Sequence, residues 1–111
     1  MSQSISVLAL SLLASGALTN RRFVTAGGAP APAAGNAVGV SRTDASDGEA
    51  VTVDVLGTAE VVAGGAIANG TAVEVGADGK AVALAAGVVV GRALEAAAAD
   101  GDVIEVLLVS N

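Results

Sequence analysis

The sequence contains neither cysteine nor histidine, and these two absences remove most of the side chains on which enzymes rely. Histidine is the commonest general base and metal ligand near neutral pH, and thiolates are needed for disulfides and thiol nucleophiles. A serine nucleophile could use only Lys80 as its base, and Lys80 lies in a predicted hairpin turn, where a solvated lysine is far commoner. We therefore expect no enzymatic activity, no cofactor, and no catalytic or metal-binding residue.

Aromatic side chains are almost absent as well, since Phe23 is the single aromatic residue in a chain of 111. Apolar residues make up 53% of the sequence, but most of them are alanine and valine. Large side chains contribute most of the free energy of burial, about 1.5–3 kcal/mol each, so a core of this composition is thin. One small domain with such a core is marginal by itself. We expect self-association or docking on a larger body to supply part of its stability.

Positive charge is scarce, because 5 basic residues stand against 11 acidic ones and the net charge is −6. A nucleic-acid surface needs clustered lysines and arginines, and Arg21–Arg22 is the only adjacent basic pair. We therefore expect no nucleic-acid partner. The acidic residues Asp44, Asp47 and Glu49 lack the alternating spacing of a calcium loop, which favours a solvated acidic loop.

Alternation of apolar and polar residues is clearest in Ala50–Leu56, where three valines alternate with Thr52 and Asp54. A period of two is typical of a strand with one buried face, so the valines are predicted to face the core and Thr52 and Asp54 the solvent. Gly57 interrupts the pattern, and a separate strand is expected over residues 58–62. Shorter strands are predicted at Arg21–Thr25, Ala37–Arg42, Thr71–Val75 and Ala81–Leu84.

Two apolar runs near the C-terminus, Gly87–Ala96 and Val103–Val109, flank the segment Asp100–Asp102. Aspartate bonds to its own backbone and glycine accepts a positive φ, so this Asp-Gly-Asp segment predicts a turn between antiparallel strands. Alanine is the best helix former, and Ala96–Ala99 leaves open one turn of helix at the end of the first strand. Short strands joined by glycine-bearing turns indicate a mainly β fold, a small single-domain β-barrel or sandwich.

The fold is completed by an extended N-terminal arm, and we assign residues 1–20 to this arm and residues 21–111 to the β domain. A signal peptide would have positive charge before its apolar run, and residues 1–4 carry none. The run is also too short and serine-rich to span a membrane, so no membrane partner is expected. A partial period of two runs through Ile5 and Val7 and, after a slip of one residue, through Leu8, Leu10 and Leu12.

The apolar side of this arm must be covered, since large exposed apolar patches mark interaction sites. Either the arm contacts a partner protein, or it adds a strand to the chain's own barrel, because edge-strand addition satisfies the same pattern. The sequence leaves both possibilities open. In the first case, Ile5, Val7, Leu8, Leu10 and Leu12, with Arg21 and Arg22 after them, form much of the contact with the partner.

A series of short motifs, in order along nearly the whole chain, resembles the small capsid cement (head decoration) proteins of tailed bacteriophages. Each motif consists mainly of glycine, alanine and valine in predicted turns and strands. The motifs are Gly16–Thr19, Arg22–Thr25, Gly39–Ser41, Gly48–Val53, Gly57–Val61, Gly65–Gly70, Asp78–Ala81, Gly91–Ala97, Asp100–Asp102 and Val106–Leu108.

The resemblance implies a structural virion protein on the outer surface of the icosahedral head. Proteins of this kind commonly bind as homotrimers, bridge neighbouring subunits of the major capsid protein, and stabilise the shell against the pressure of packaged DNA. The family brings no catalytic or cofactor-binding residues. The arm residues and the two arginines are then expected to contact the capsid or a neighbouring subunit.

Two other functions remain as alternatives. The apolar start and the acidic composition suit a secreted bacterial surface or adhesion module. Lys80, which follows Asp78-Gly79 in a predicted turn, resembles the modified lysine of lipoyl and biotinyl carrier domains, although their acidic and hydrophobic context is missing.

Overall fold

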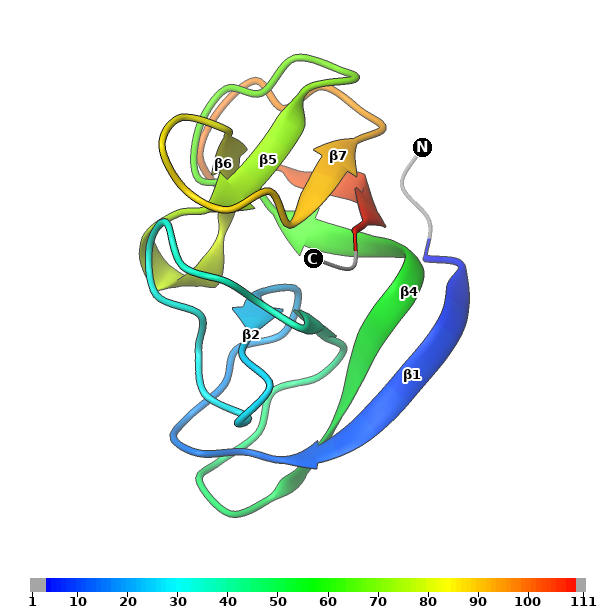
Figure 1. Cartoon of the computed structure of the whole chain (residues 1–111), viewed down its shortest axis with the longest axis vertical. Coiled ribbons are helices and arrows are strands. Elements are labelled where there is room, and N and C mark those ends of the chain that lie inside the picture. Colours follow the sequence, from blue (N-terminus) through cyan, green and yellow to red (C-terminus); the bar gives the residue numbers. More distant parts are fainter. Residues whose placement is uncertain (1–3, 110–111) are drawn as a thin grey trace.

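The computed structural model describes residues 4–109, and the chain forms a mainly β structure organised around one long strand (Figure 1). The strands are β1 (Ser6–Leu13), β2 (Phe23–Val24), β3 (Gly39–Ser41), β4 (Ala50–Val62), β5 (Ala72–Val75), β6 (Ala81–Ala83), β7 (Gly91–Ala93) and β8 (Val103–Leu108), and a short 3-10 turn, η1 (Ala77–Gly79), joins β5 to β6. The pairings between these strands are antiparallel. The predicted mainly β fold of short antiparallel strands is confirmed.

Strand β4 belongs to both halves of the molecule. Its first half pairs with β1 and β3, and its second half pairs with β8. The sequence predicted two strands separated by Gly57, and this prediction is wrong, because the strand continues through Gly57 with a positive φ of 100°. Glycine adopts this conformation without the steric cost of a Cβ, so the strand turns here without ending.

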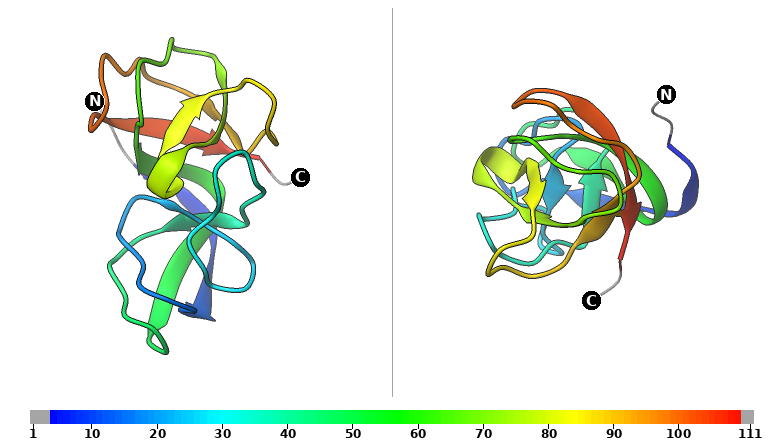
Figure 2. Two further views of the ribbon diagram at one scale, coloured as in Figure 1. Left: turned by 90° about the vertical axis from the view of Figure 1, so that its left-hand side faces the viewer. Right: turned by 90° about the horizontal axis from the view of Figure 1, so that it is seen from above.

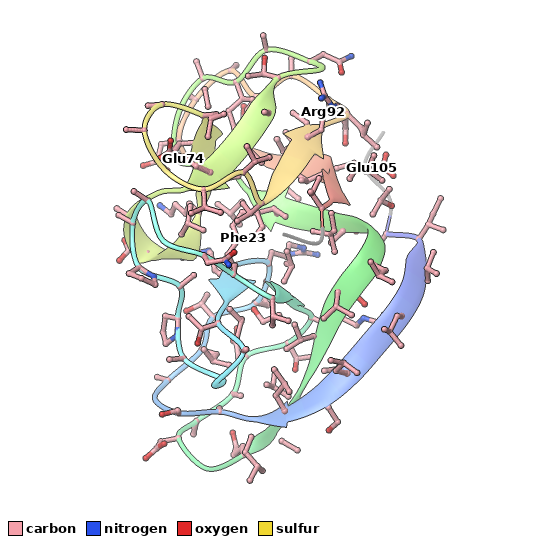
Figure 3. All side chains as sticks on the ribbon, in the orientation of Figure 1. Phe23, Glu74, Arg92 and Glu105 are labelled. Carbon is pink, nitrogen blue, oxygen red and sulfur yellow. The ribbon has the colours of Figure 1, made fainter. Side chains whose placement is uncertain are left out.

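The upper half in Figure 1 is a small, nearly closed barrel, in the strand order β4-β8-β7-β5-β6. A parallel bridge between Ala63 and Ala81 joins β6 back to the end of β4, and the Gly64 N–H donates to the Ala81 carbonyl at 2.7 Å. Buried valines, alanines and Ile104 fill this barrel. Phe23 points from β2 into the same core and is 1% exposed (Figure 3).

The lower half is the sheet formed by β1, β4, β3 and β2, and it has its own small core. The alternating valines Val51, Val53 and Val55 are buried there together with Leu18 and Val24, as their pattern predicted. The left view of Figure 2 shows the barrel above and this sheet below, joined through β4. A chain of small side chains therefore builds two thin cores in place of one large core.

Asp54 is the exception to the predicted alternation in β4. It was expected to face solvent, but it is 2% exposed. The Arg42 guanidinium covers it and donates to both carboxylate oxygens, from Nη2 to Oδ1 and from Nε to Oδ2 at 3.4 Å. A buried carboxylate needs such a partner, and the period-two pattern does not indicate one.

The C-terminal hairpin is shorter than predicted. Of the expected strand Gly87–Ala96 only Gly91–Ala93 forms β7, whereas β8 matches its prediction. The alternative helical turn at Ala96–Ala99 does not form, because Ala97 exchanges backbone hydrogen bonds with Ile67 at 2.9 and 3.0 Å. Contacts with a remote loop override the helix propensity of alanine here.

Candidate functional site

Strand β1 forms the outer edge of the lower sheet (Figure 1) and leaves most of its side chains in solvent. It pairs with β4 in the register Leu10↔Val53 and Leu12↔Val51. Val7 is 73% exposed and Leu13 69% exposed, which are high values for apolar side chains in a sheet. The structure thus shows the arm adding a strand to the chain's own sheet, while its apolar side chains remain uncovered.

The apolar alternation of the arm slips by one residue between Val7 and Leu8, and β1 is irregular at the same place. The register of β1 against β4 shifts between Ser6 and Leu8 and again between Leu8 and Ala9. Such a bulge reorients the side chains that follow it. Beyond it, Leu12 packs against the lower core, while Leu8 and Leu10 lie outside that core. The one-residue slip read from the sequence therefore has a structural counterpart.

Leu8 and Leu10 form part of an apolar groove of about 440 Å³ on the surface of the lower sheet. Its lining contains no charged side chain and consists of Leu8, Leu10, Ala26, Asn36, Ala37, Val38, Val55, Leu56 and Val109. Most of the walls were missed by sequence reasoning, because they come from a loop and from the end of the chain. The only local signal was Leu56, an apolar residue on the polar side of the β4 alternation.

Two glycines with positive φ hold the ends of β1 by close backbone approach. A Cβ on Gly57 would lie 2.1 Å from the Ile5 carbonyl oxygen, and a Cβ on Gly28 would lie 2.1 Å from the Leu13 carbonyl oxygen. Ile5 also exchanges backbone hydrogen bonds with Thr58 at 3.2 and 2.9 Å. The strand is therefore fixed in place at both ends.

Gly57→Ala is expected to loosen the start of β1 and to lower the free energy of unfolding by more than the about 1–2 kcal/mol that a left-handed backbone costs a residue with a Cβ. Gly48→Ala is the matched control, because Gly48 also has a positive φ, of 85°, but a Cβ at that position would meet no other atom within 4 Å. Chemical denaturation followed by circular dichroism measures both variants. Equal losses would show that the approach of Ile5 contributes nothing.

Arg21 and Arg22, the other predicted contact residues, lie in a turn that is hydrogen-bonded to β3. Arg21 has a positive φ of 58°, its N–H donates to the Ser41 carbonyl at 2.8 Å, and its Nε lies 3.7 Å from Glu60 Oε2. Arg22 donates from Nη1 to the Asp78 carbonyl at 3.3 Å and lines a separate hollow of about 210 Å³. Neither arginine lines the groove of Leu8 and Leu10, so the structure does not bring the whole predicted set together there.

Asp44 holds the chain just before these arginines. Both the backbone N–H and the side-chain amide of Asn20 donate to Asp44 Oδ1 at 2.8 Å. These hydrogen bonds, the backbone one first, lower the pKa of Asp44, and the charge of Arg22 adds to the effect. A carboxylate that accepts donors in the folded state is stabilised in its charged form.

This lowered pKa predicts an acid-sensitive component of stability. Because the folded-state pKa of Asp44 lies below the unfolded value of about 3.9, its contribution is present above that value and is lost as the pH falls through the folded-state pKa. Melting temperatures measured from pH 6 downward are expected to fall less for Asp44→Asn than for the unmodified protein. Asn20→Ala, which removes one of the two donors, should give an intermediate profile. Identical profiles for all three proteins would contradict the prediction.

Lys80 does not have the geometry expected of a carrier lysine. Its Nζ lies 3.0 Å from Asp100 Oδ1, and its side chain is only 21% exposed. A carrier domain presents its lysine at an exposed tip, whereas this lysine lies against the barrel and forms an ion pair. The structure therefore gives no support to modification at Lys80.

The buried carboxylate of Glu74 was not identified from the sequence. Glu74, on β5, is 7% exposed and accepts hydrogen bonds from the backbone N–H groups of Ala85 and Gly87 (Figure 3). It fixes the loop between β6 and β7, which is a structural role.

In residues 4–109 no three histidine, cysteine, aspartate or glutamate side chains gather as a metal site would need. No helix in this part of the chain has the length and hydropathy to cross a bilayer.

Comparison with known proteins gives a family and a fold. Residues 2–108 match the family described as "Phage cement protein". Among curated protein sequences none matches the chain significantly. Among solved structures, the N base of the head fibre gp8.5 of bacteriophage phi29 superposes with a TM-score of 0.75 at 22% identity, over 92% of this chain and 93% of that one. At this identity, the likeness shows a shared fold.

The family match carries more weight than the structural likeness, because it extends over nearly the whole sequence. The ordered series of motifs, the mainly β barrel and the uncovered edge strand agree with it. The chain belongs to the phage cement protein family and is a structural protein of the virion, located on the capsid.

Proposed function

We propose that this protein binds the outer surface of the phage head as a homotrimer and cements neighbouring subunits of the major capsid protein. It thereby stabilises the shell against the pressure of the packaged DNA. The single observation that supports this best is β1, a firmly held strand of uncharged residues whose apolar side chains lie in solvent. A monomeric soluble protein rarely leaves such a surface uncovered.

Residues 1–20 act in this proposal as the contact arm and residues 21–111 as the β domain that presents it; residues 1–3 and 110–111 lie outside the described part of the chain. Ile5, Val7, Leu8, Leu10 and Leu12 contact the capsid or a neighbouring subunit, and Arg21 and Arg22 add polar contacts from the adjacent turn. Arg22 suits this role because its side chain lines the separate hollow of about 210 Å³.

Three copies in one particle raise the strength of attachment without any new kind of contact. Linked sites can bind about 10²–10⁴ times more tightly than one site, so each contact can be weak. The proposal includes no catalysis, no cofactor and no nucleic-acid partner. A net charge of −6 agrees with a surface that does not neutralise phosphates.

Co-sedimentation with emptied, expanded phage heads tests this function. We expect the unmodified protein to sediment with the heads, and Val7→Asp to bind at least about tenfold more weakly, because an aspartate would have to be desolvated in the contact. Leu94→Asp is the matched control, since Leu94 is also an exposed apolar residue, 38% exposed, but follows β7 on the barrel. Failure of the unmodified protein to bind any heads would overturn the proposal.

A further inference from the structure

We propose that the free edge of β1 pairs with β1 of a second copy of this chain, antiparallel and across a two-fold axis at Leu10. The proposal deepens the proposed function, because it rests on β1 as a contact surface and names what covers its edge. The groove face and the loops remain available to the capsid.

The backbone of β1 presents unpaired groups on the side away from β4. The Ala14 N–H donates to the Glu49 carbonyl at 2.8 Å, and the register is regular from Ala9 to Leu13. Hydrogen-bonding groups alternate between the two sides of an antiparallel strand. Leu10 and Leu12 therefore direct theirs toward β4, and Ala9 and Ser11 direct theirs outward. In residues 4–109, β1 pairs with no strand other than β4.

Apart from the bulge between Ser6 and Ala9, this edge has none of the features that protect exposed strands from pairing. Natural edge strands carry lysine, proline or inward charges, or are very short. Ser6–Leu13 is eight residues long, has no charged residue and no proline, and ends where Gly28 approaches Leu13. Figure 1 shows it at the rim of the lower sheet with nothing beyond it.

Residues of similar size lie at equal distances on either side of Leu10 in β1. Two antiparallel copies of β1 centred on Leu10 would therefore match, which is why we propose a second copy as the partner of this edge. In an antiparallel pair centred there, Leu8 lies opposite Leu12 of the second copy, and Leu10 lies opposite its own equivalent. Ala9 lies opposite Ser11, so small side chains face small ones and the outward backbone groups of both residues meet. Residues directly opposite each other share one face of a sheet, so the leucines of both copies form one apolar surface.

Electrostatics permit this contact despite the charge of the chain. Each copy carries a net charge of −6, but the sequence from Ser4 to Asn20 contains no charged residue. Of the acidic residues near β1, Asp54 is buried under Arg42, whereas Asp47 and Glu49 lie beyond the C-terminal end of the strand. The middle of the edge therefore carries little charge to repel a second copy.

The contact requires particles with an even number of chains. A two-fold contact is isologous and closes on itself, so β1 pairing alone gives a dimer, and together with a separate three-fold contact whose axis is perpendicular it gives a hexamer. Sedimentation velocity and light scattering measure this directly, with a mass of 10.4 kDa for each chain. A dimer or a hexamer supports the proposal, and a monomer or an isolated trimer overturns it.

Charged residues substituted for Leu10 test whether the two copies meet at the proposed two-fold axis. L10D and L10K each place like charges opposite each other, and each is expected to weaken association at least about tenfold. An equimolar mixture of L10D and L10K places opposite charges together and should restore paired particles. Leu10 is 40% exposed, so both variants are expected to fold. No recovery in the mixture would overturn the two-fold contact at Leu10.

Proline at the edge tests the backbone bonds. Ser11→Pro removes only an outward N–H, and proline is tolerated on edge strands with that orientation. It should prevent pairing, whereas Ser11→Val, which keeps the N–H, should not. Equal association of the two variants would contradict the proposal, and so would rapid hydrogen exchange of the Ala9 and Ser11 amides in the unmodified protein.

These outcomes are separable from the proposed function. Association in solution without heads is measured apart from co-sedimentation with heads. A protein that binds heads but shows no association through β1 retains the cement function and refutes only the pairing. A Ser11→Pro protein that is monomeric, like the unmodified protein, but has lost binding to heads would assign the edge to the capsid and overturn the pairing of copies.

Discussion

Phe23→Ala is expected to lower the free energy of unfolding by about 3–5 kcal/mol, the usual cost of emptying a buried aromatic site. Phe23 is 1% exposed and is the only aromatic side chain in the chain, and it packs in a core made mainly of alanines and valines, which are too small to fill the space it would leave. It joins β2 of the lower sheet to the core of the barrel. A domain of this size has about 5–15 kcal/mol in total, so this variant loses a large share.

Urea unfolding followed by far-ultraviolet circular dichroism measures the loss, because the chain has no tryptophan or tyrosine to report by fluorescence. Phe23→Leu keeps most of the volume and should cost less than about 1.5 kcal/mol. If Phe23→Ala loses no more than Phe23→Leu, the two halves of the molecule do not depend on this side chain.

Arg42→Ala is expected to be the next most damaging substitution, at about 2–4 kcal/mol, because it leaves the carboxylate of Asp54 buried without its partner. The Asp54 side chain is 3% exposed, while that of Arg42 is 48% exposed. In Arg42→Ala, water can therefore solvate part of the Asp54 carboxylate in place of the guanidinium. The expected loss of unfolding free energy is for this reason smaller than the largest losses measured for fully buried ion pairs. Asp54 raises the pKa of Arg42, chiefly through their hydrogen bond, so the arginine stays charged at any pH used.

A double-mutant cycle distinguishes the loss of the Arg42–Asp54 ion pair from other effects of removing the Arg42 side chain. Asp54→Asn in the Arg42→Ala background should recover at least about half of the loss, because an amide is less costly to bury than a lone carboxylate. Arg92→Ala is the control: Arg92 is exposed and donates to the Gly70 carbonyl at 2.8 Å. Surface changes of this kind cost well under about 1 kcal/mol. No recovery in the double mutant would show that burial of Asp54 is not what Arg42 offsets.

Both predictions follow from the scarcity of large side chains. Because the cores consist mainly of alanine and valine, single contacts such as Phe23 and the Arg42–Asp54 pair matter more than they would in a bulkier core. The same scarcity explains the uncovered leucines of β1, since the lower core has too few residues to cover them. A partner surface completes such a domain, which is what attachment to a capsid provides.

The sequence by itself determined the features that depend on neighbouring residues. Alternation predicted the buried valines of β4, the turn residues predicted the hairpins β5–β6 and β7–β8, and the arm pattern contained the slip at Leu8 that the bulge of β1 explains. Side chains of a strand alternate between its two faces every two residues, so these features can be predicted from residues that are close together in the sequence.

Only the tertiary structure decided which of these surfaces are covered. The burial of Asp54 depends on Arg42, twelve residues away, and the groove beside β1 depends on Ala37 and Val109. The union of two predicted strands into β4 depends on Ile5 and Thr58 meeting at the Gly57 bend. Burial is a property of the packed whole, because the atoms that cover a side chain come from remote segments whose positions no local pattern contains.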